Sequence, residues 1–145
     1  MRDSAPRRPC PVLSTRALHA RGTLTAKILS AELVIGITVC NQARRLPRAL
    51  RSALSQTVVD NGQAVVVLLD DQSTDGWRES CGKLLEHPSV LVIEGVCGSA
   101  SRARNALLDF VDQHLPGARW VARLDADDVL ASSVSVAELC REGDE

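Results

Sequence analysis

The chain has 145 residues, a net charge of −1 and only 2% aromatic residues, so any core must be aliphatic. This length supports one ordinary domain, and the sequence contains no apolar run long enough to cross a membrane. The small net charge hides an asymmetry, because residues 1–30 carry six basic side chains and one acid while the rest is net acidic. A nucleic-acid-binding surface should be basic, so the acidic body argues against a nucleic-acid partner.

Residues 1–30 are predicted to form a tail that is either disordered or targeting-like. Three prolines interrupt regular structure, and the arginines are spread through polar sequence. A simple extension is the preferred interpretation, and an organelle transit peptide is the alternative. The five cysteines are scattered without a C-x-x-C pair, which disfavours zinc and favours reduced thiols in a cytoplasmic protein.

Residues 31–145 are predicted to form the folded domain, and the first strand is Leu33–Val39. This run is apolar and rich in β-branched residues, which is typical of a strand buried on both faces. A polar turn follows at Cys40–Gln42. Pro47 then opens a helix, since proline is tolerated in a first helical turn. The helix has one apolar face and a second face rich in arginine.

The next two units repeat this order. Ala64–Leu69 is a second buried strand, and it ends in Asp70 and Asp71. Ser73 or Thr74 is expected to cap the helix that follows. Val90–Ile93 is predicted as a third strand, followed by a loop of small residues around Gly98. The helix after that loop has apolar residues at helical spacing, namely Ala103, Ala106, Leu107, Phe110 and Val111.

The fourth strand, Trp120–Leu124, leads into three carboxylates at Asp125, Asp127 and Asp128. Unpaired anions at one strand end repel each other, and a hard divalent cation with oxygen ligands is the usual solution. The alternative is that one of them caps the next helix, and Asp128 is the best candidate for that role. A short helix is expected over Ser132–Arg141.

Alternation of strands and helices predicts an α/β fold with a mostly parallel sheet flanked by helices. Ligands of such sheets bind beyond the carboxyl ends of the strands. The polar side chains after the four strands should therefore converge at one edge. The sequence has no G-x-G-x-x-G after its first strand and no G-x-x-x-x-G-K-[ST], so Rossmann and P-loop sites are poorly supported.

Four motifs in this order carry a resemblance to a known family. They are Ile35-Gly-Ile-Thr-Val-Cys-Asn41, Leu68-Leu-Asp-Asp-Gln-Ser-Thr-Asp-Gly76, Ala103-Arg-Asn-Ala106 and Leu124-Asp-Ala-Asp-Asp128. Together they resemble the nucleotide-sugar-binding half of the family 2 glycosyltransferases, which have the GT-A fold. The resemblance covers residues from about Leu33 to Leu130.

The resemblance implies a site for each matching residue. The expected donor nucleotide-binding residues are Thr38, Asn41, Asp70, Asp71, Arg104 and Asp125, and the expected metal ligand is Asp127. Asp70 and Asp71 would contact the base beside the backbone of Ile37–Val39. Arg104 would lie near the ribose or the diphosphate, and Asp125 near the ribose. Asp127 would bind Mn²⁺ or Mg²⁺, which bridges the diphosphate.

The implied activity is glycosyl transfer from a nucleotide-diphosphate sugar, expected to be a UDP-sugar, with inversion at the sugar. Three departures bear on this. Thr38 stands where the family usually has proline, and Gln72 replaces a usual glycine. Only 15 residues follow Leu130, so the general base and acceptor half are not expected in this chain, which looks incomplete at its C-terminus. A second chain could supply that half. The alternative function is an inactive or partner-dependent nucleotide-diphosphate-binding module.

Overall fold

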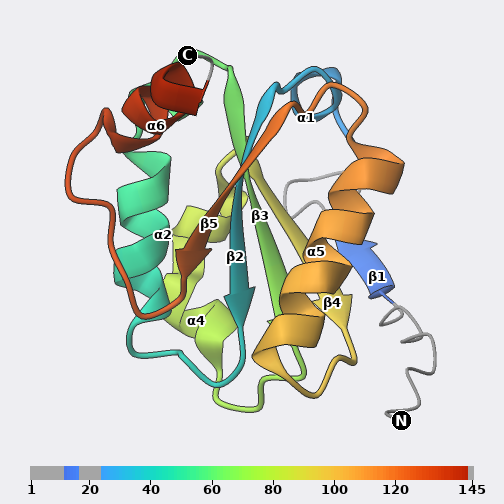
Figure 1. Ribbon diagram of the computed structural model, residues 1–145. Helices are drawn as coiled ribbons and strands as arrows, with labels where there is room; N and C mark the ends of the chain where they lie inside the picture. The colour runs from blue at the N-terminus through green and yellow to red at the C-terminus, as the bar shows by residue number, and fades with distance from the viewer. Residues whose placement is uncertain (1–11, 17–23, 144–145) are drawn as a thin grey trace, which may run out of the picture.

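The computed structural model describes residues 12–16 and 24–143 of the chain. Along the sequence the elements are β1 (Val12–Arg16), α1 (Ala26–Leu29), β2 (Leu33–Val39), α2 (Leu46–Leu54), α3 (Thr57–Asp60), β3 (Ala64–Asp71), α4 (Trp77–Cys81), the 3₁₀ helix η1 (Gly82–Glu86), β4 (Val90–Gly95), α5 (Ala100–His114), β5 (Trp120–Asp125) and α6 (Ser135–Gly143). Helices cover both faces of one twisted sheet (Figure 1).

The sheet has five strands in the order β1-β4-β3-β2-β5. The four strands predicted from the sequence are parallel to one another, and β1 runs antiparallel to β4. This arrangement confirms the predicted fold class, a mostly parallel sheet flanked by helices. Because β2 lies between β3 and β5, the carboxyl ends of these three strands are neighbours.

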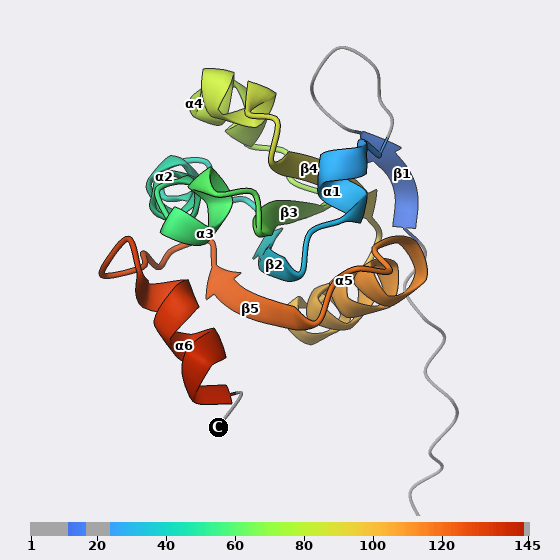
Figure 2. The same ribbon diagram turned by 90° about the horizontal axis from the view of Figure 1, so that it is seen from above.

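Two apolar layers sandwich the central strands. All eight residues of β3 are buried, and alternate residues along the strand belong to different core clusters. One face packs against α2, α3, α4 and α6, and the other packs against α1 and α5 (Figure 2). The continuous apolar runs of the sequence are thus strands covered on both sides, as parallel strands usually are.

The long helix α5 crosses β2 at close range because of one glycine. A Cβ atom on Gly36 would lie 2.8 Å from Cδ2 of Leu107, so no larger residue fits without a shift. Ser99 caps the helix, and its hydroxyl accepts a hydrogen bond from the backbone N–H of Arg102 at 3.3 Å. The first turns of α5 therefore lie beside the carboxyl ends of the strands.

Several local predictions need correction. β1 and α1 fall within the stretch expected to be a tail, where the sequence analysis predicted no element. Ser73 and Thr74 do not cap a helix, because α4 begins only after Gly76, which has a left-handed φ of 73°. Asp128 is not a cap either, since α6 begins at Ser135.

Two further sequence expectations concern thiols and membranes. Cys40 and Cys81 are free thiols, but Cys97 is disulfide-bonded, so the expectation of reduced thiols throughout is wrong at that position. Within residues 24–143, no helix combines the length and the apolar character that crossing a bilayer requires. The boundary between tail and domain at residue 30 stays a prediction.

Candidate functional site

A cavity of about 540 Å³ lies at the carboxyl edge of β2, β3 and β5, beside the start of α5. Five of the predicted site residues line it, namely Thr38, Asp71, Arg104, Asp125 and Asp127. The other two, Asn41 and Asp70, do not. The polar side chains that follow different strands therefore do converge at this edge, as parallel topology requires.

Asp71 forms the inner wall of this cavity, and its side chain is tied to the protein's own backbone. The residue is only 7% exposed. Its carboxylate accepts hydrogen bonds from the backbone N–H of Cys97 at 2.7 Å and from that of Gly98 at 3.1–3.2 Å. Gly98 has a φ of 77°, a left-handed conformation that suits glycine. Asp71 thus holds the turn from which α5 starts.

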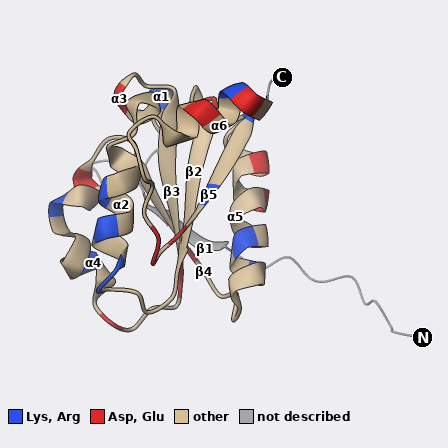
Figure 3. Cartoon of the chain, turned by 60° about the vertical axis from the view of Figure 1, so that its left-hand side comes forward, with Lys and Arg blue, Asp and Glu red and all other residues tan. Residues whose placement is uncertain are grey.

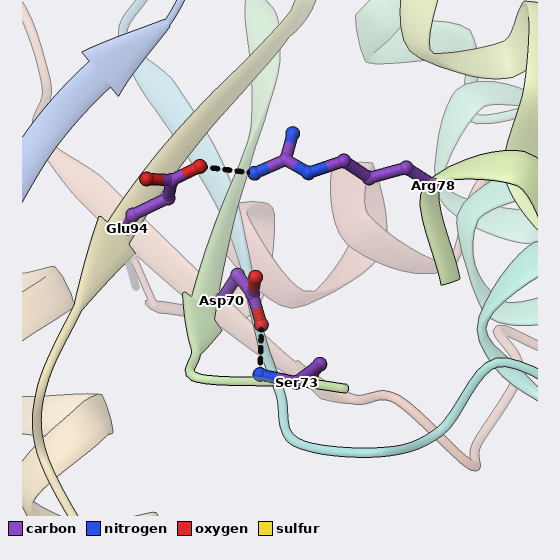
Figure 4. Close-up of polar contacts among 4 residues, drawn as sticks. All are labelled: Asp70, Ser73, Arg78 and Glu94. Carbon is purple, nitrogen blue, oxygen red and sulfur yellow. Dashed lines mark hydrogen bonds and ion pairs between the residues drawn. The ribbon is translucent and has the colours of Figure 1, made fainter. Parts of the chain in front are cut away.

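Asp70 points to the opposite face of the sheet, because successive residues of a strand alternate. Its carboxylate accepts a hydrogen bond from the backbone N–H of Ser73 at 3.0 Å (Figure 4). Glu94 lies opposite Asp70 in the register of β3 and β4, and Arg78 forms an ion pair with Glu94. This arrangement fastens the turn after β3 and keeps Asp70 out of the cavity.

Asn41 connects two loops rather than facing the cavity. Its side-chain oxygen accepts a hydrogen bond from the backbone N–H of Thr74 at 2.8 Å, and its own N–H donates to the hydroxyl of Ser73 at 3.0 Å. Asp75 makes a similar link, accepting a hydrogen bond from the backbone N–H of Ala43 at 2.8 Å. No role for Asp75 was predicted from the sequence.

The carboxylates at the end of β5 are more open. Oxygen atoms of Asp125, Asp127 and Asp128 lie within 4.8 Å of one another, and the last two residues are exposed. In Figure 3 the acidic colour runs into the loop that follows β5. Like charges this close repel each other, so the cluster favours a bound cation.

Three arginines approach this cluster, and the sequence analysis anticipated only one of them. Arg104 lies 3.5 Å from Asp125, Arg123 lies 3.7 Å from the same oxygen, and Arg45 lies 3.8 Å from Asp127. Arg123 precedes Asp125 by two residues on one strand, so period-two alternation could have identified it. Arg45 lies in a loop, where the sequence offers no comparable signal.

A buried glutamine fixes the segment that follows the acidic cluster. Gln56 is 1% exposed and donates to the backbone oxygens of Ser52 and Ser132, while its own oxygen accepts from the N–H of Val136. The hydroxyl of Ser52 also accepts a hydrogen bond from the N–H of Leu130 at 3.1 Å. The helical layer thus anchors both the end of the acidic loop and the start of α6.

Cys40 at the cavity and Cys81 away from it are both poor nucleophiles at neutral pH. Burial, together with the nearby carboxylates of Asp71, Asp70 and Asp75, raises the pKa of Cys40, which lines the cavity. Burial raises the pKa of Cys81 to about 11. The thiolate is the reactive form, so neither residue suits a catalytic nucleophile.

A family model for glycosyl transferase family 2 matches residues 34–141, most of the chain. The chain belongs to this family. It is 34% identical over 107 residues to a chondroitin synthase from Pasteurella multocida strain Pm70. A hyaluronan synthase from the same species shows the same identity over the same length. The match covers 73% of this chain and 10% of each synthase.

Two solved structures share the fold of this family 2 chain. The Staphylococcus aureus protein TarS, solved as residues 1–349, superposes with a TM-score of 0.62 at 20% identity, covering 78% of this chain and 32% of that one. The Pyrobaculum calidifontis mannosyltransferase PcManGT, solved with GDP-Man and Mn²⁺, gives a TM-score of 0.59 at 18% identity over 93% of this chain and 35% of that one. These two structures support the GT-A fold that the sequence motifs led us to expect.

The acidic cluster of this family 2 domain fits a divalent cation by its donor chemistry. All three side chains offer carboxylate oxygens, which are ligands that Mg²⁺ and Mn²⁺ prefer. A site with few protein ligands leaves positions for phosphate oxygens, and the cavity lies beside it. Arg104 lines the cavity 3.5 Å from Asp125 and brings a permanently charged guanidinium to it.

Proposed function

We propose that the chain binds the nucleoside-diphosphate portion of a sugar donor in this cavity, for glycosyl transfer, with a divalent cation held by Asp127. The proposal rests on one observation: the walls of this single cavity differ in burial and in charge. Asp71 forms a buried wall with the half-buried Thr38 beside it, and the half-buried Arg104 and Asp125 form a charged wall that opens towards the exposed Asp127.

The buried wall suits the base and the open wall suits the diphosphate. Thr38 and the neighbouring backbone of β2 offer hydrogen-bonding groups next to Asp71. Ser99 and Ala100 bring the N-terminus of the 15-residue helix α5 to the cavity next to Asp71, and Arg104, one helical turn further on, lies beside Asp125. A helix N-terminus favours negative charge, and Arg104 adds a permanent cation there.

The open wall also suits the proposed chemistry. Breaking the bond between a sugar and a nucleoside diphosphate leaves negative charge on the diphosphate. Arg104 and the start of α5 would stabilise that charge as it develops. A bound Mn²⁺ or Mg²⁺ would add Lewis-acid stabilisation of the same oxygens. Transfer is proposed to be inverting, and no residue of this chain is proposed as the general base.

The solved neighbour with GDP-Man and Mn²⁺ supports a nucleotide sugar and a divalent metal as ligands of this fold. Which nucleotide base the cavity accepts is a separate question. The family resemblance favours a UDP-sugar, whereas that neighbour carries a guanine nucleotide. UDP, GDP and TDP are therefore the ligands to compare.

Calorimetric titration of the chain with these three diphosphates, with and without Mn²⁺, tests the proposal. We expect one nucleotide to bind only when Mn²⁺ is present, and Asp127→Asn to abolish that binding. Asp109→Asn removes an exposed carboxylate of α5 that does not line the cavity and should bind like the wild type. Binding that is independent of metal, or equal in both variants, would contradict the proposal.

A second candidate function is a nucleotide-diphosphate-binding module that transfers no sugar by itself. The chain spans about a tenth of the length of the two synthases that it resembles, so sugar transfer is the part of the proposal that needs its own test. Incubation with the sugar donor of the nucleotide that binds separates the two candidates. Metal-dependent binding without release of the nucleoside diphosphate would favour the module, and release in the presence of an acceptor sugar would favour the enzyme.

A further inference from the structure

The loops that follow β2 and β3 are joined by four hydrogen bonds between residues more than 30 positions apart in sequence, one of which runs from the Thr74 hydroxyl to the side-chain oxygen of Asn41 at 3.4 Å. Thr74 N–H donates to the side-chain oxygen of Asn41, Asn41 N–H donates to the hydroxyl of Ser73, and Ala43 N–H donates to Asp75. We call this set of side chains and amides the loop clasp.

The loop clasp acts beyond the end of the sheet. β2 and β3 are paired in register up to Val39 and Asp70, so the strands themselves are already fixed. Past that point both loops adopt an uncommon conformation, because Asn41 has a φ of 54° and Gln72 a φ of 57°. Left-handed backbone at residues other than glycine persists only where surrounding contacts hold it. The clasp supplies such contacts.

The clasp residues lie next to the cavity without lining it. Cys40 and Gln42 on one loop and Gln72 on the other line the cavity, together with Thr38 and Asp71 at the ends of β2 and β3. Asn41, Ser73, Thr74 and Asp75 do not. Any effect of the clasp on a bound ligand must therefore pass through the loop residues that it holds.

We propose that Asn41 and Asp75 are positioning residues that set the distance between the two loops and thereby shape the base end of the nucleotide pocket. The inference rests on the proposed function, since it assumes a nucleotide in this cavity. It also changes the expectation for Asn41, from a ligand contact to a loop contact. The diphosphate end, at Arg104 and Asp127, is built mainly by α5 and β5. Asp127 also forms a 3.8 Å ion pair with the exposed Arg45 of the loop after β2, and Arg45 is not a clasp residue.

The base end and the diphosphate end of the pocket can be tested separately, because one of two test ligands uses both ends and the other uses only the diphosphate end. A nucleoside diphosphate with Mn²⁺ uses both ends, whereas inorganic pyrophosphate with Mn²⁺ uses only the diphosphate end. Asp75→Ala removes the acceptor for Ala43 N–H, while Asp75→Asn removes the charge but keeps an acceptor oxygen. Asn41→Gly removes the other acceptor and keeps a residue that tolerates a positive φ.

Asp75→Ala and Asn41→Gly should each weaken nucleoside-diphosphate binding about tenfold, the equivalent of one hydrogen bond. Pyrophosphate binding should stay within about twofold, and Asp75→Asn should bind both ligands like the wild type. Alkylation of Cys40 supplies a readout without ligand, with Cys40→Ser as its control. Cys40 should be alkylated faster in Asp75→Ala than in Asp75→Asn. Both variants lack the carboxylate charge of Asp75, but only Asp75→Ala is expected to open the loops.

Two outcomes would overturn this inference. One is equal loss of both ligands in Asp75→Ala, which would mean a general loss of structure. The other is wild-type nucleotide affinity in Asp75→Ala and Asn41→Gly. A wild-type chain that binds pyrophosphate with Mn²⁺ but no nucleoside diphosphate would instead contradict the proposed function, and the inference would fall with it.

Discussion

The carboxylates after β3 and those after β5 follow similar apolar strands but have opposite surroundings. Asp70 and Asp71 are each less than 10% exposed and accept hydrogen bonds from backbone amides. Asp127 and Asp128 are exposed, and the nearest cation to Asp127 among the described residues is Arg45 at 3.8 Å. A buried carboxylate needs hydrogen-bond partners within the protein, whereas an exposed carboxylate cluster is solvated by water until a ligand binds. The first group therefore shapes the pocket, and the second is available to a metal.

The largest effect on stability should come from Asp71→Ala. The change leaves the amides of Cys97 and Gly98 without their charged acceptor, in a place where Asp71 is 7% exposed. We expect the free energy of unfolding to fall by about 3 kcal/mol, measured by urea denaturation. Asp127→Ala is the matched variant at the other strand end, and it should change stability by less than about 0.5 kcal/mol without ligand.

For ligand affinity, unlike stability, we expect a large effect from a change at Asp127, and Asp127→Asn tests this. Loss of a direct ligand should weaken metal-dependent nucleotide binding at least about a hundredfold, the upper end of what outer-shell changes cause. Asp128→Asn sharpens the comparison, since Asp128 belongs to the same cluster but does not line the cavity. Calorimetry in the presence of Mn²⁺ should show a smaller loss for Asp128→Asn. Equal nucleotide affinities for the wild type and Asp127→Asn would contradict the proposal that Asp127 binds the metal.

Gln56→Leu tests how the open strand end is held in place. Leucine has a similar size but leaves the oxygens of Ser52 and Ser132 and the amide of Val136 without their partner. We expect a loss of about 2 kcal/mol in the free energy of unfolding. Gln63→Leu, at an exposed glutamine away from the cavity, is the control and should be nearly neutral. A neutral Gln56→Leu would mean that the acidic loop needs no anchor.

The smallest effect concerns His87, at the edge of the sheet away from the site. Burial, and next the charge of Lys27, lowers the pKa of His87, so the unfolded chain binds this proton more readily. Stability should therefore fall as the pH drops below about 6.5, well above the range where ordinary carboxyls titrate. His87→Asn keeps an acceptor for the N–H of Ser89 and should flatten thermal stability between pH 7 and 5. An unchanged slope would assign that pH dependence to other groups.

The sequence predicted the parallel strands because their apolar runs need two covered faces. It also predicted that polar side chains meet at one edge, since parallel strands all end there. It gave Asp70 and Asp71 the same role, although alternation along β3 sends their side chains to opposite faces. That signal was available. The roles of Asn41 and Gln56 in joining distant segments were not, because the partners in those segments lie 32 or more residues away and depend on loop conformation. β1 was missed for the same reason, since it pairs with the distant β4.

Urea unfolding of the wild type, Asp71→Ala and Asp127→Ala, each with and without Mn²⁺ and the nucleoside diphosphate that binds, tests the contrast between the two strand ends most directly. A ligand that binds only the folded state raises stability in proportion to the logarithm of its concentration over Kd. We predict that Asp71→Ala loses stability before any ligand is added. Asp127→Ala should match the wild type without ligand and gain nothing when ligand is added. The account would be contradicted if Asp127→Ala were as unstable as Asp71→Ala, or if it kept the full stabilisation by metal and nucleotide.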